Sequence, residues 1–246
     1  MACRILLAHS HEIVRIGLRV ILEANSRVSI CGEAVDGLDA IRQAHQLRPD
    51  IVIADYNIPK ANGFIVSRRI LRRRAGQKLL IIDVVESATV VRRLIRAGVR
   101  AIVSMSDPAS AFENAIDALQ RNRPYFPRFV ERLLLEQYLS PEKGAGLEVC
   151  DECLSLRQQE VVQLLAEGRS TKEVAAVLGL STKTAETHRS AILRKLQLHN
   201  IAQLTRYAVS QHIVTVIRGP QPLPLPAIDS PEKVISQSAK ALTIAA

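Results

Sequence analysis

Short apolar runs alternate with amphipathic stretches five times in the first 121 residues. Runs that are apolar at nearly every position must be covered on both faces, so this alternation predicts a parallel sheet between two layers of helices. The predicted strands are 4–8, 28–35, 51–55, 79–84 and 101–105, and the predicted helices are 11–25, 37–47, 63–75, 87–98 and 109–121. Functional side chains of such sheets lie beyond the carboxyl ends of the strands, which here are His9, Ser10, Asp55, Asp83 and Met105.

Downstream of the sheet pattern, the chain carries three helix signals separated by two short breaks. Ser155 stands three residues before Gln158, which is the capping-box spacing that satisfies the free N–H groups of a helix start. Ser170 stands in the same relation to Glu173, and Ser181 supplies a side-chain oxygen for a third helix start. The pattern therefore predicts a helix-turn-helix with a short helix at 172–178, a glycine-containing turn and a longer helix at 182–196.

The longer helix separates into two faces at about 100° per residue. Ala185, Ile192 and Leu196 share the inward side, with His188 on its edge. The opposite side is polar and consists of Lys183, Glu186, Thr187, Ser190 and Arg194. An amphipathic surface helix is the commoner meaning of such a pattern, but the cap, the turn and the preceding short helix favour a helix that enters the DNA major groove.

The segments LRQQEVV, AEGRSTKEVA, LSTKTAETH and LRKL resemble the LuxR-type helix-turn-helix domain. The resemblance implies base reading by Glu186, Thr187 and Ser190. It implies contacts to the DNA backbone, or support of the helix, for Lys172, Lys183, His188 and Lys195, and Thr184 and Arg194 complete the predicted DNA-binding set. Two departures, Ile201 in place of the family's usual arginine and the small Ser190, mean that a base preference cannot be transferred.

The first half resembles the receiver domain of response regulators, a flavodoxin-like (βα)5 fold, in the segments ILLAHSHEIVRIGL, PDIVIADYNIPKANG and RAGVRA. A receiver followed by a LuxR-type domain is the order of NarL/FixJ-type transcriptional regulators. LuxR-type domains often dimerise through their fourth helix, expected here at 201–212. The resemblance thus implies a homodimer on two half-sites of double-stranded DNA.

The chemistry at the strand ends departs from that of a phosphorylatable receiver, which holds Mg²⁺ with two acidic residues beside an acceptor aspartate. His9 and Ser10 occupy the positions of the acidic pair, although Mg²⁺ prefers carboxylate and water ligands. The family's Ser/Thr is Asp83, its lysine is Met105 and its aromatic switch residue is Ile102. Only Asp55, the phosphoacceptor equivalent, is retained, so we expect a degenerate receiver that works without phosphorylation.

Several alternatives stay open for this pocket. Asp55 is either a residual phosphoacceptor or a structural carboxylate bonded to His9 or to a loop N–H group, and repulsion from Asp83 would raise one of the two pKa values. The receiver could hold a constitutive dimer, or bind a protein partner or a small ligand. A transition metal at His9, His11 and Asp55 and a pH response of His9 are further alternatives, but the prediction is no metal and no cofactor.

The net charge of +9 is consistent with a polyanionic partner. Residues 1–121 hold 18 basic and 12 acidic side chains, a net charge of +6, whereas residues 151–217 hold 8 and 6, a net charge of only +2. The excess lies in arginines at 68–74 and 92–96, read as solvated helix faces or, alternatively, as a surface for nucleic acid or an acidic partner. With no membrane-length apolar run and no signal peptide, we expect a cytoplasmic protein. Its four cysteines should be reduced, with the pair at 150 and 153 read as linker thiols rather than a metal or redox site.

The expected organisation is a receiver-like domain at 1–121, a linker with a short helix at 122–150, a LuxR-type domain at 151–217 and a Pro-rich, disordered tail at 218–246, with a peptide ligand as the alternative meaning of the tail. The leading hypothesis is a DNA-binding transcriptional regulator. A regulatory adaptor that scarcely touches DNA is the main alternative. Enzyme activity is not expected, since the chain has no Gly-rich phosphate loop and no G-x-S-x-G motif.

Overall fold

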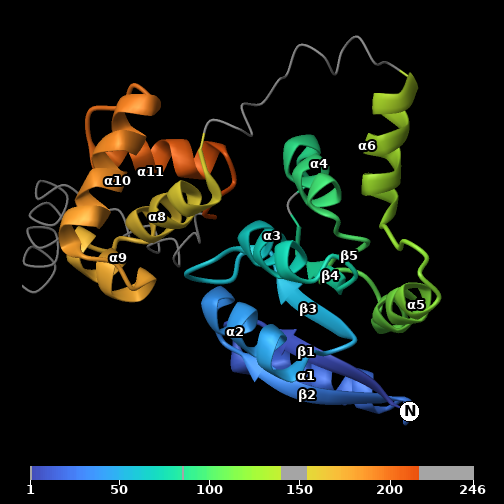
Figure 1. Ribbon diagram of the computed structural model, residues 1–246. Coiled ribbons are helices and arrows are strands. Elements are labelled where there is room, and N and C mark those ends of the chain that lie inside the picture. The colour runs from blue at the N-terminus through green and yellow to red at the C-terminus, as the bar shows by residue number, and fades with distance from the viewer. Residues whose placement is uncertain (1, 85, 140–153, 216–246) are drawn as a thin grey trace, which may run out of the picture. The chain divides into compact units, whose positions relative to one another are not determined.

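A computed structural model describes residues 2–84, 86–139 and 154–215, and Figure 1 shows how their helices and strands are arranged. The first half folds around a five-stranded parallel sheet in the order β2-β1-β3-β4-β5. The strands are β1 (Cys3–Ala8), β2 (Val28–Ala34), β3 (Ile51–Asp55), β4 (Lys78–Ile82) and β5 (Ala101–Val103). The sheet confirms the predicted flavodoxin-like fold, in which ligands bind at the carboxyl edge where the strand order reverses.

Helices cover both faces of this sheet, as the apolar strands require. The helices are α1 (Glu12–Glu23), α2 (Gly37–Leu47), α3 (Gly63–Arg73), α4 (Ala88–Ala97) and α5 (Ala109–Gln120). Alternate residues of one strand enter different cores: Leu6 packs with α2, α3 and α4, whereas Ile5 and Leu7 pack with α1 and α5. All three side chains are fully buried.

Three strands end earlier than the apolar pattern predicts, β2 by one residue and both β4 and β5 by two residues. β4 stops at Ile82 because Asp83 has a left-handed φ of 56°, which does not continue a strand. β5 stops at Val103 because the next residues form a turn, in which the Ser104 N–H donates to Asp107 Oδ2 over 2.8 Å. Asp83 and Met105 therefore lie in loops rather than on the last residues of strands.

The first part of the predicted linker packs on the receiver. Tyr125 forms an isolated parallel bridge with Ala101, beyond the edge strand β5. Helix α6 (Arg128–Leu139) follows and contacts α4, and its Val130 is fully buried in the core that α4 shares with the sheet. Cys150, Cys153 and the Pro-rich tail lie outside the described residues. Within the described residues, Cys3 and Cys31 are free cysteines.

The second half is a four-helix domain built on the predicted caps. Its helices are α8 (Leu156–Ala166), α9 (Thr171–Leu178), α10 (Thr182–Lys195) and α11 (Ile201–Ser210). Both predicted capping boxes are present, at Ser155 and Ser170, and the Ser181 side chain accepts from the Thr184 N–H. Val162, Ile192 and Leu204 are fully buried in its core. None of the helices in the described residues is long and apolar enough to span a membrane.

Candidate receiver pocket and nucleic-acid interface

The carboxyl edge of the sheet brings His9, Asp55 and Asp83 into one neighbourhood. β1 pairs with β3 through Ala8 and Ala54, so His9 and Asp55 leave adjacent strands side by side, with His9 Nε2 3.9 Å from Asp55 Oδ2. Asp55 pairs with Ile82, directly before Asp83, and the charge of Asp83 acts on the pKa of both groups. Met105 is instead 42% exposed on its turn. The Ser10 hydroxyl faces His11 Nδ1 at 3.3 Å, on the exposed side.

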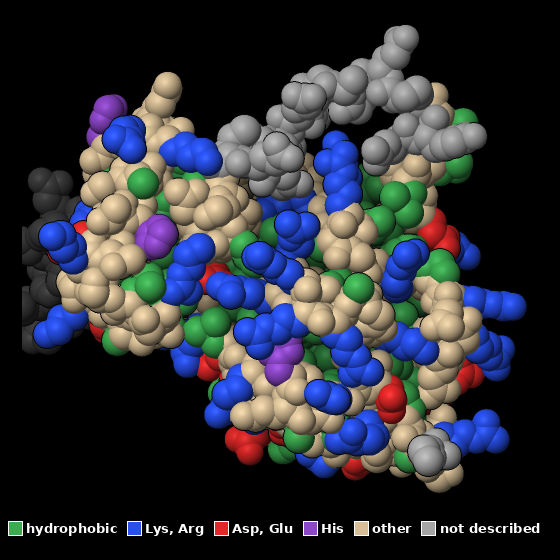
Figure 2. Space-filling model, viewed as in Figure 1, with side chains coloured by type: hydrophobic (Ala, Val, Ile, Leu, Met, Phe, Trp, Pro, Cys, Tyr) green, Lys and Arg blue, Asp and Glu red, His purple; other side chains and the backbone are tan. Residues whose placement is uncertain are grey.

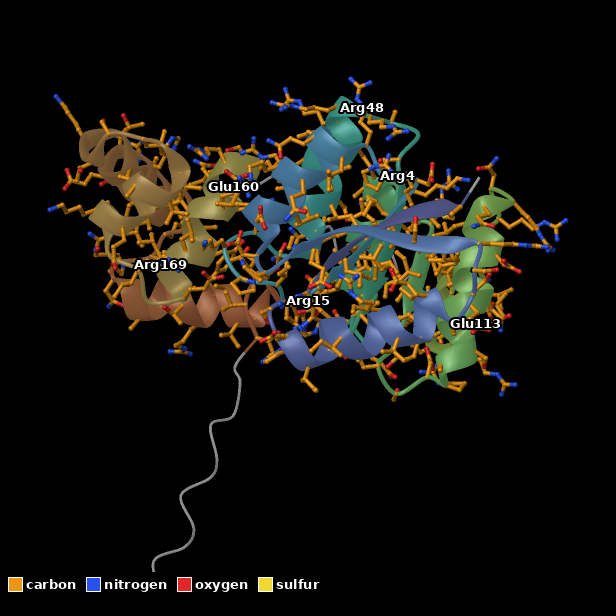
Figure 3. All side chains as sticks on the ribbon, turned by 90° about the horizontal axis from the view of Figure 1, so that it is seen from below. Arg4, Arg15, Arg48, Glu113, Glu160 and Arg169 are labelled. Carbon is orange, nitrogen blue, oxygen red and sulfur yellow. The ribbon has the colours of Figure 1, made fainter. Side chains whose placement is uncertain are left out.

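Hydrogen bonds at both ends hold His9 in one orientation. Its Nδ1 accepts from the His11 N–H over 3.0 Å, and its carbonyl accepts from Arg15 Nη1 over 2.9 Å. Arg15 is itself buried and donates from Nε to Glu33 over 2.9 Å (Figure 3). Because Nδ1 is an acceptor here, the neutral ring carries its proton on Nε2, toward Asp55. Burial lowers the pKa of His9, and the positive charges of His11 and Arg15 lower it further, against an opposing effect of Asp83.

Asp55 is a buried carboxylate, only 5% exposed, at the end of β3. Its Oδ1 accepts from the Asn57 N–H over 3.1 Å, so the loop N–H bond considered for this residue is present. The distance to His9 exceeds that of a hydrogen bond. Burial raises the pKa of Asp55 to about 6, and the charge of Asp83 adds to the rise, while the Asn57 N–H and His11 oppose it.

The groups around Asp55 do not fit a Mg²⁺ site. Mg²⁺ requires near-octahedral oxygen ligands, usually including carboxylates, whereas the residue after β1 that lies beside Asp55 is His9, an imidazole, and the Ser10 hydroxyl faces His11 instead. Within residues 2–84, 86–139 and 154–215, no group of three or more His, Cys, Asp or Glu side chains is arranged to hold a metal ion.

The loop that follows Asp55 contacts the helical domain. The Tyr56 hydroxyl donates to the His212 carbonyl over 3.0 Å, and Asn62 Nδ2 donates to the Ile213 carbonyl over 2.9 Å. The Asn57 side chain accepts a hydrogen bond from Thr215. The segment after α11 is thus bonded to the loop that begins at the pocket.

Three polar side chains of α8 face the receiver and are buried, which the sequence pattern did not reveal. Glu160 is fully buried and accepts from Arg69 Nε of α3 over 2.6 Å (Figure 3). Gln159 accepts from Arg93 of α4 over 3.0 Å, and Gln163 accepts from the Asn62 N–H over 2.8 Å. Every residue from Gln159 to Leu165 is buried, so this stretch of α8 has no side that faces solvent.

The predicted DNA-binding residues lie on α10, apart from Lys172, which lies on α9. Ala185 and Ile192 are fully buried, as the two-faced pattern requires. The residues of the set that are exposed are Lys172, Lys183, Thr184, Glu186, Thr187, Ser190, Arg194 and Lys195. His188 is half-buried, in keeping with its place on the edge of the inward side. The exposed side combines cations with hydroxyl groups, the side chains that meet phosphates and base edges in a groove.

Comparisons with known proteins agree with this architecture. Residues 5–116 match the response regulator receiver domain, and residues 152–208 match the luxR family of bacterial regulatory proteins. The transcriptional regulatory protein LiaR of Bacillus subtilis is 30% identical over 211 residues, which are 86% of this chain and 99% of LiaR. The oxygen regulatory protein NreC of Staphylococcus carnosus is 26% identical over 214 residues, 86% of this chain and 99% of NreC.

Solved structures give the same result. RcsB from Salmonella enterica serovar Typhimurium, bound to promoter rprA in the presence of phosphomimetic BeF₃⁻, has a TM-score of 0.54 and 25% identity, covering 84% of this chain and 98% of that one. Another structure, of the RcsB–DNA complex, has a TM-score of 0.51 and 25% identity. The chain therefore belongs to the response regulators that join a receiver domain to a LuxR-type DNA-binding domain, and it is a transcription factor of the two-component type.

Proposed function

We propose that this response regulator binds its DNA sites as a homodimer without a phosphoryl cycle at Asp55. The observation that carries the proposal is the surroundings of Asp55: a buried carboxylate with His9 beside it, Asp83 close enough to raise its pKa and Met105 where a lysine would stand.

The physical argument concerns charge. A phosphorylated Asp55 would carry about −1.5 to −2 charges on its phosphoryl oxygens, by analogy with other phosphorylated side chains, and a buried site must neutralise them. Asp83 contributes repulsion and Met105 contributes no cation. Arg15 is a buried cation that contacts His9, but its guanidinium is engaged by Glu33 and by the His9 carbonyl. A phosphoryl group on Asp55 would therefore be strongly disfavoured.

The proposed DNA contacts are the exposed set on α9 and α10. Glu186, Thr187 and Ser190 would meet base edges, while Lys172, Lys183 and Lys195 would meet phosphates. For the dimer, α11 offers one exposed apolar side chain. Leu204 and Ala208 are buried in the domain, but Ile201 is 39% exposed. That position suits contact with a second copy of the same helix.

The test for phosphorylation is intact-mass measurement after incubation with Mg²⁺ and acetyl phosphate. We expect no added phosphoryl mass. A stoichiometric label that disappears in Asp55→Asn would refute the proposal for the receiver, and Asp117→Asn, at an exposed position of α5, serves as the matched control.

The test for DNA binding is selection of genomic fragments by the untreated full-length protein. We expect a recurring two-fold motif without any phosphodonor. Recovery of such a motif only after treatment with the phosphodonor would contradict binding independent of phosphorylation, and retention without any motif would favour the adaptor function.

A further inference from the structure

Arginines without acidic neighbours crowd the outer side of α2, α3 and α4. Neither α3 nor α4 contains an Asp or Glu. We define the arginine face as Arg48, Arg68, Arg72, Arg73, Arg92 and Arg96. Five of these side chains are exposed and Arg92 is half-buried, and among the described residues none of the six forms an ion pair. Figure 2 shows Lys and Arg side chains massed over this part of the molecule, with few acidic ones between them.

Contacts between the helices make the face continuous. α3 packs against both α2 and α4. Burial lowers the pKa of His45 on α2, and the positive charge of Arg73 on α3 lowers it further. The electrostatic field of α3 therefore reaches α2. Helices α3 and α4 also lie close together where α4 ends. A Cβ atom added to Gly98, the C-cap residue of α4, would lie 3.1 Å from Leu71 of α3. Arg48, just after α2, points away from the sheet (Figure 3).

Folding does not require this arrangement. Like charges four residues apart on a helix destabilise it by about 0.2–0.5 kcal/mol per pair, and Arg68–Arg72 and Arg92–Arg96 are two such pairs. Two neighbouring arginines do have structural partners: Arg69 pairs with Glu160, and Arg93 stacks 4.3 Å above the Phe64 ring. The arginine face has no such partners in the described residues, which indicates a ligand from outside the receiver.

The chemistry of the face favours a phosphate backbone over a protein. Protein interfaces place apolar and aromatic anchors at their centre. The large apolar side chains exposed in the described residues lie elsewhere, on α1, α6, α11 and in loops, and none is on α3 or α4. Interfaces with DNA are polar and strongly positive, and the planar guanidinium group matches phosphate geometry.

We infer that the arginine face is a second DNA-binding surface, which holds the phosphate backbone of duplex flanking the site bound by α10. The inference rests on the DNA binding proposed above. It explains why residues 1–121 carry a net charge of +6 while residues 151–217 carry only +2. It also fits the contact between the domains, because Arg69 of α3 is paired with Glu160 of α8, so the face begins beside the helix-turn-helix domain. DNA held by that domain is thereby presented to the receiver at high effective concentration.

The experiment compares two variants of the full-length protein that lose the same charge. In the face variant, four residues are changed to glutamine: Arg68, Arg72, Arg73 and Arg96. In the control variant, four exposed arginines of the α5–α6 region are changed to glutamine: Arg121, Arg123, Arg128 and Arg132. Affinity is measured across a salt series on mixed-sequence duplexes of about 20 and about 40 base pairs, the shorter one just spanning two half-sites.

On the longer duplex we expect the slope of log affinity against log salt to be shallower by about 2–4 in the face variant than in the wild type. Each lost phosphate contact reduces the magnitude of this slope by about 0.9. The control variant should match the wild type on both duplexes, and the face variant should match it on the shorter one. Equal effects of the two variants, or no effect of either, would overturn the inference and leave the proposed function standing. Failure of the wild type to bind either duplex would overturn both.

Arginine modification by phenylglyoxal gives a readout that does not depend on affinity. With the longer duplex present, Arg68 and Arg72 should be protected while Arg121 stays reactive. Unprotected face arginines in a DNA-bound protein, or protection by polyglutamate instead of DNA, would assign the face to an acidic protein and refute the inference.

Discussion

The receiver pocket and helix α10 are the two candidate functional regions of this chain, and they differ in how closely they match the residues that the family resemblance implies. Helix α10 has the predicted capped start at Ser181, a buried side through Ala185 and Ile192, and a polar side open to solvent. The receiver has the predicted sheet with Asp55 at the end of β3, but His9, Ser10 and Asp83 stand where the resemblance implies other residues. The difference shows that a parallel sheet sets the position of a site without setting its chemistry.

The physical reason is that the position of the site and the chemistry of the site depend on different residues. The sheet is specified by side chains such as Leu6, Ile53 and Leu80, which are buried among the helices. The pocket residues come after the strands, where substitution leaves the core packing intact. This receiver carries His9 and Ser10 after β1 and still forms the five-stranded sheet. Restoring the chemistry should accordingly be a matter of a few side chains.

The largest effect should come from restoring the pocket in one variant. It combines His9→Asp, Ser10→Asp, Asp83→Thr and Met105→Lys, which together supply metal ligands, remove the repelling carboxylate and add a cation. We expect phosphoryl mass to appear with Mg²⁺ and acetyl phosphate, in contrast to the absence of phosphoryl mass that we expect for the wild type. The same four changes with Asp55→Asn are the control, and a folded four-residue variant that gains no label would show that the backbone of this edge has changed as well.

Replacing the buried carboxylate should stabilise the protein. The folded-state pKa of Asp55 is about 6, above its ordinary value of 3.8, so the residue favours the fold only when protonated. That contribution is complete below about pH 4 and is lost as the pH rises through 6. Asp55→Asn should therefore raise the free energy of unfolding by roughly 2–3 kcal/mol at pH 7.5, with the gain fading toward pH 4.

Chemical denaturation at several pH values measures this gain. Asp117→Asn, at an exposed position, should show no comparable dependence on pH. A destabilised Asp55→Asn protein at pH 7.5 would mean that the charge of Asp55 is needed by a partner, and would contradict the description of the pocket as a buried, poorly neutralised carboxylate.

The sequence predicted the fold far better than the contacts between the two regions. Apolar runs located all five strands and the caps located three helix starts, because both signals are local. The burial of Glu160 was not predicted, since its partner Arg69 lies 91 residues away and a glutamate on a helix ordinarily faces water. The end of β4 was missed because the pattern of apolar residues gives no indication that Asp83 adopts a left-handed backbone conformation.

Glu160 also provides a test of how the two regions are joined. Removing one partner of a buried ion pair costs about 3–5 kcal/mol, but Arg69 and Arg157 are 40% and 30% exposed and can return to water. Glu160→Ala should thus cost about 2 kcal/mol and separate the thermal unfolding of the receiver from that of the helical domain. Glu136→Ala, which breaks a surface pair with Arg132, should cost less than about 0.5 kcal/mol. A single unchanged transition in Glu160→Ala would show that the ion pairs of Glu160 are not what couples the two domains.

The smallest expected effect tests helix α10, the other region of the comparison. Lys183 is exposed on the first turn of α10, next to the capped helix start, where a phosphate would also meet free backbone N–H groups. Lys183→Ala should weaken binding about five- to tenfold on all duplexes and flatten the salt dependence by about 0.9, without altering the preferred sequence. Lys78→Ala removes the same charge from the receiver, where the amine donates to the Gln120 carbonyl, and should leave both quantities unchanged. If Lys183→Ala instead changed which sequences are selected while the slope stayed the same, the lysine would be reading bases, and the division of α10 into base-reading and phosphate-holding residues would have to be redrawn.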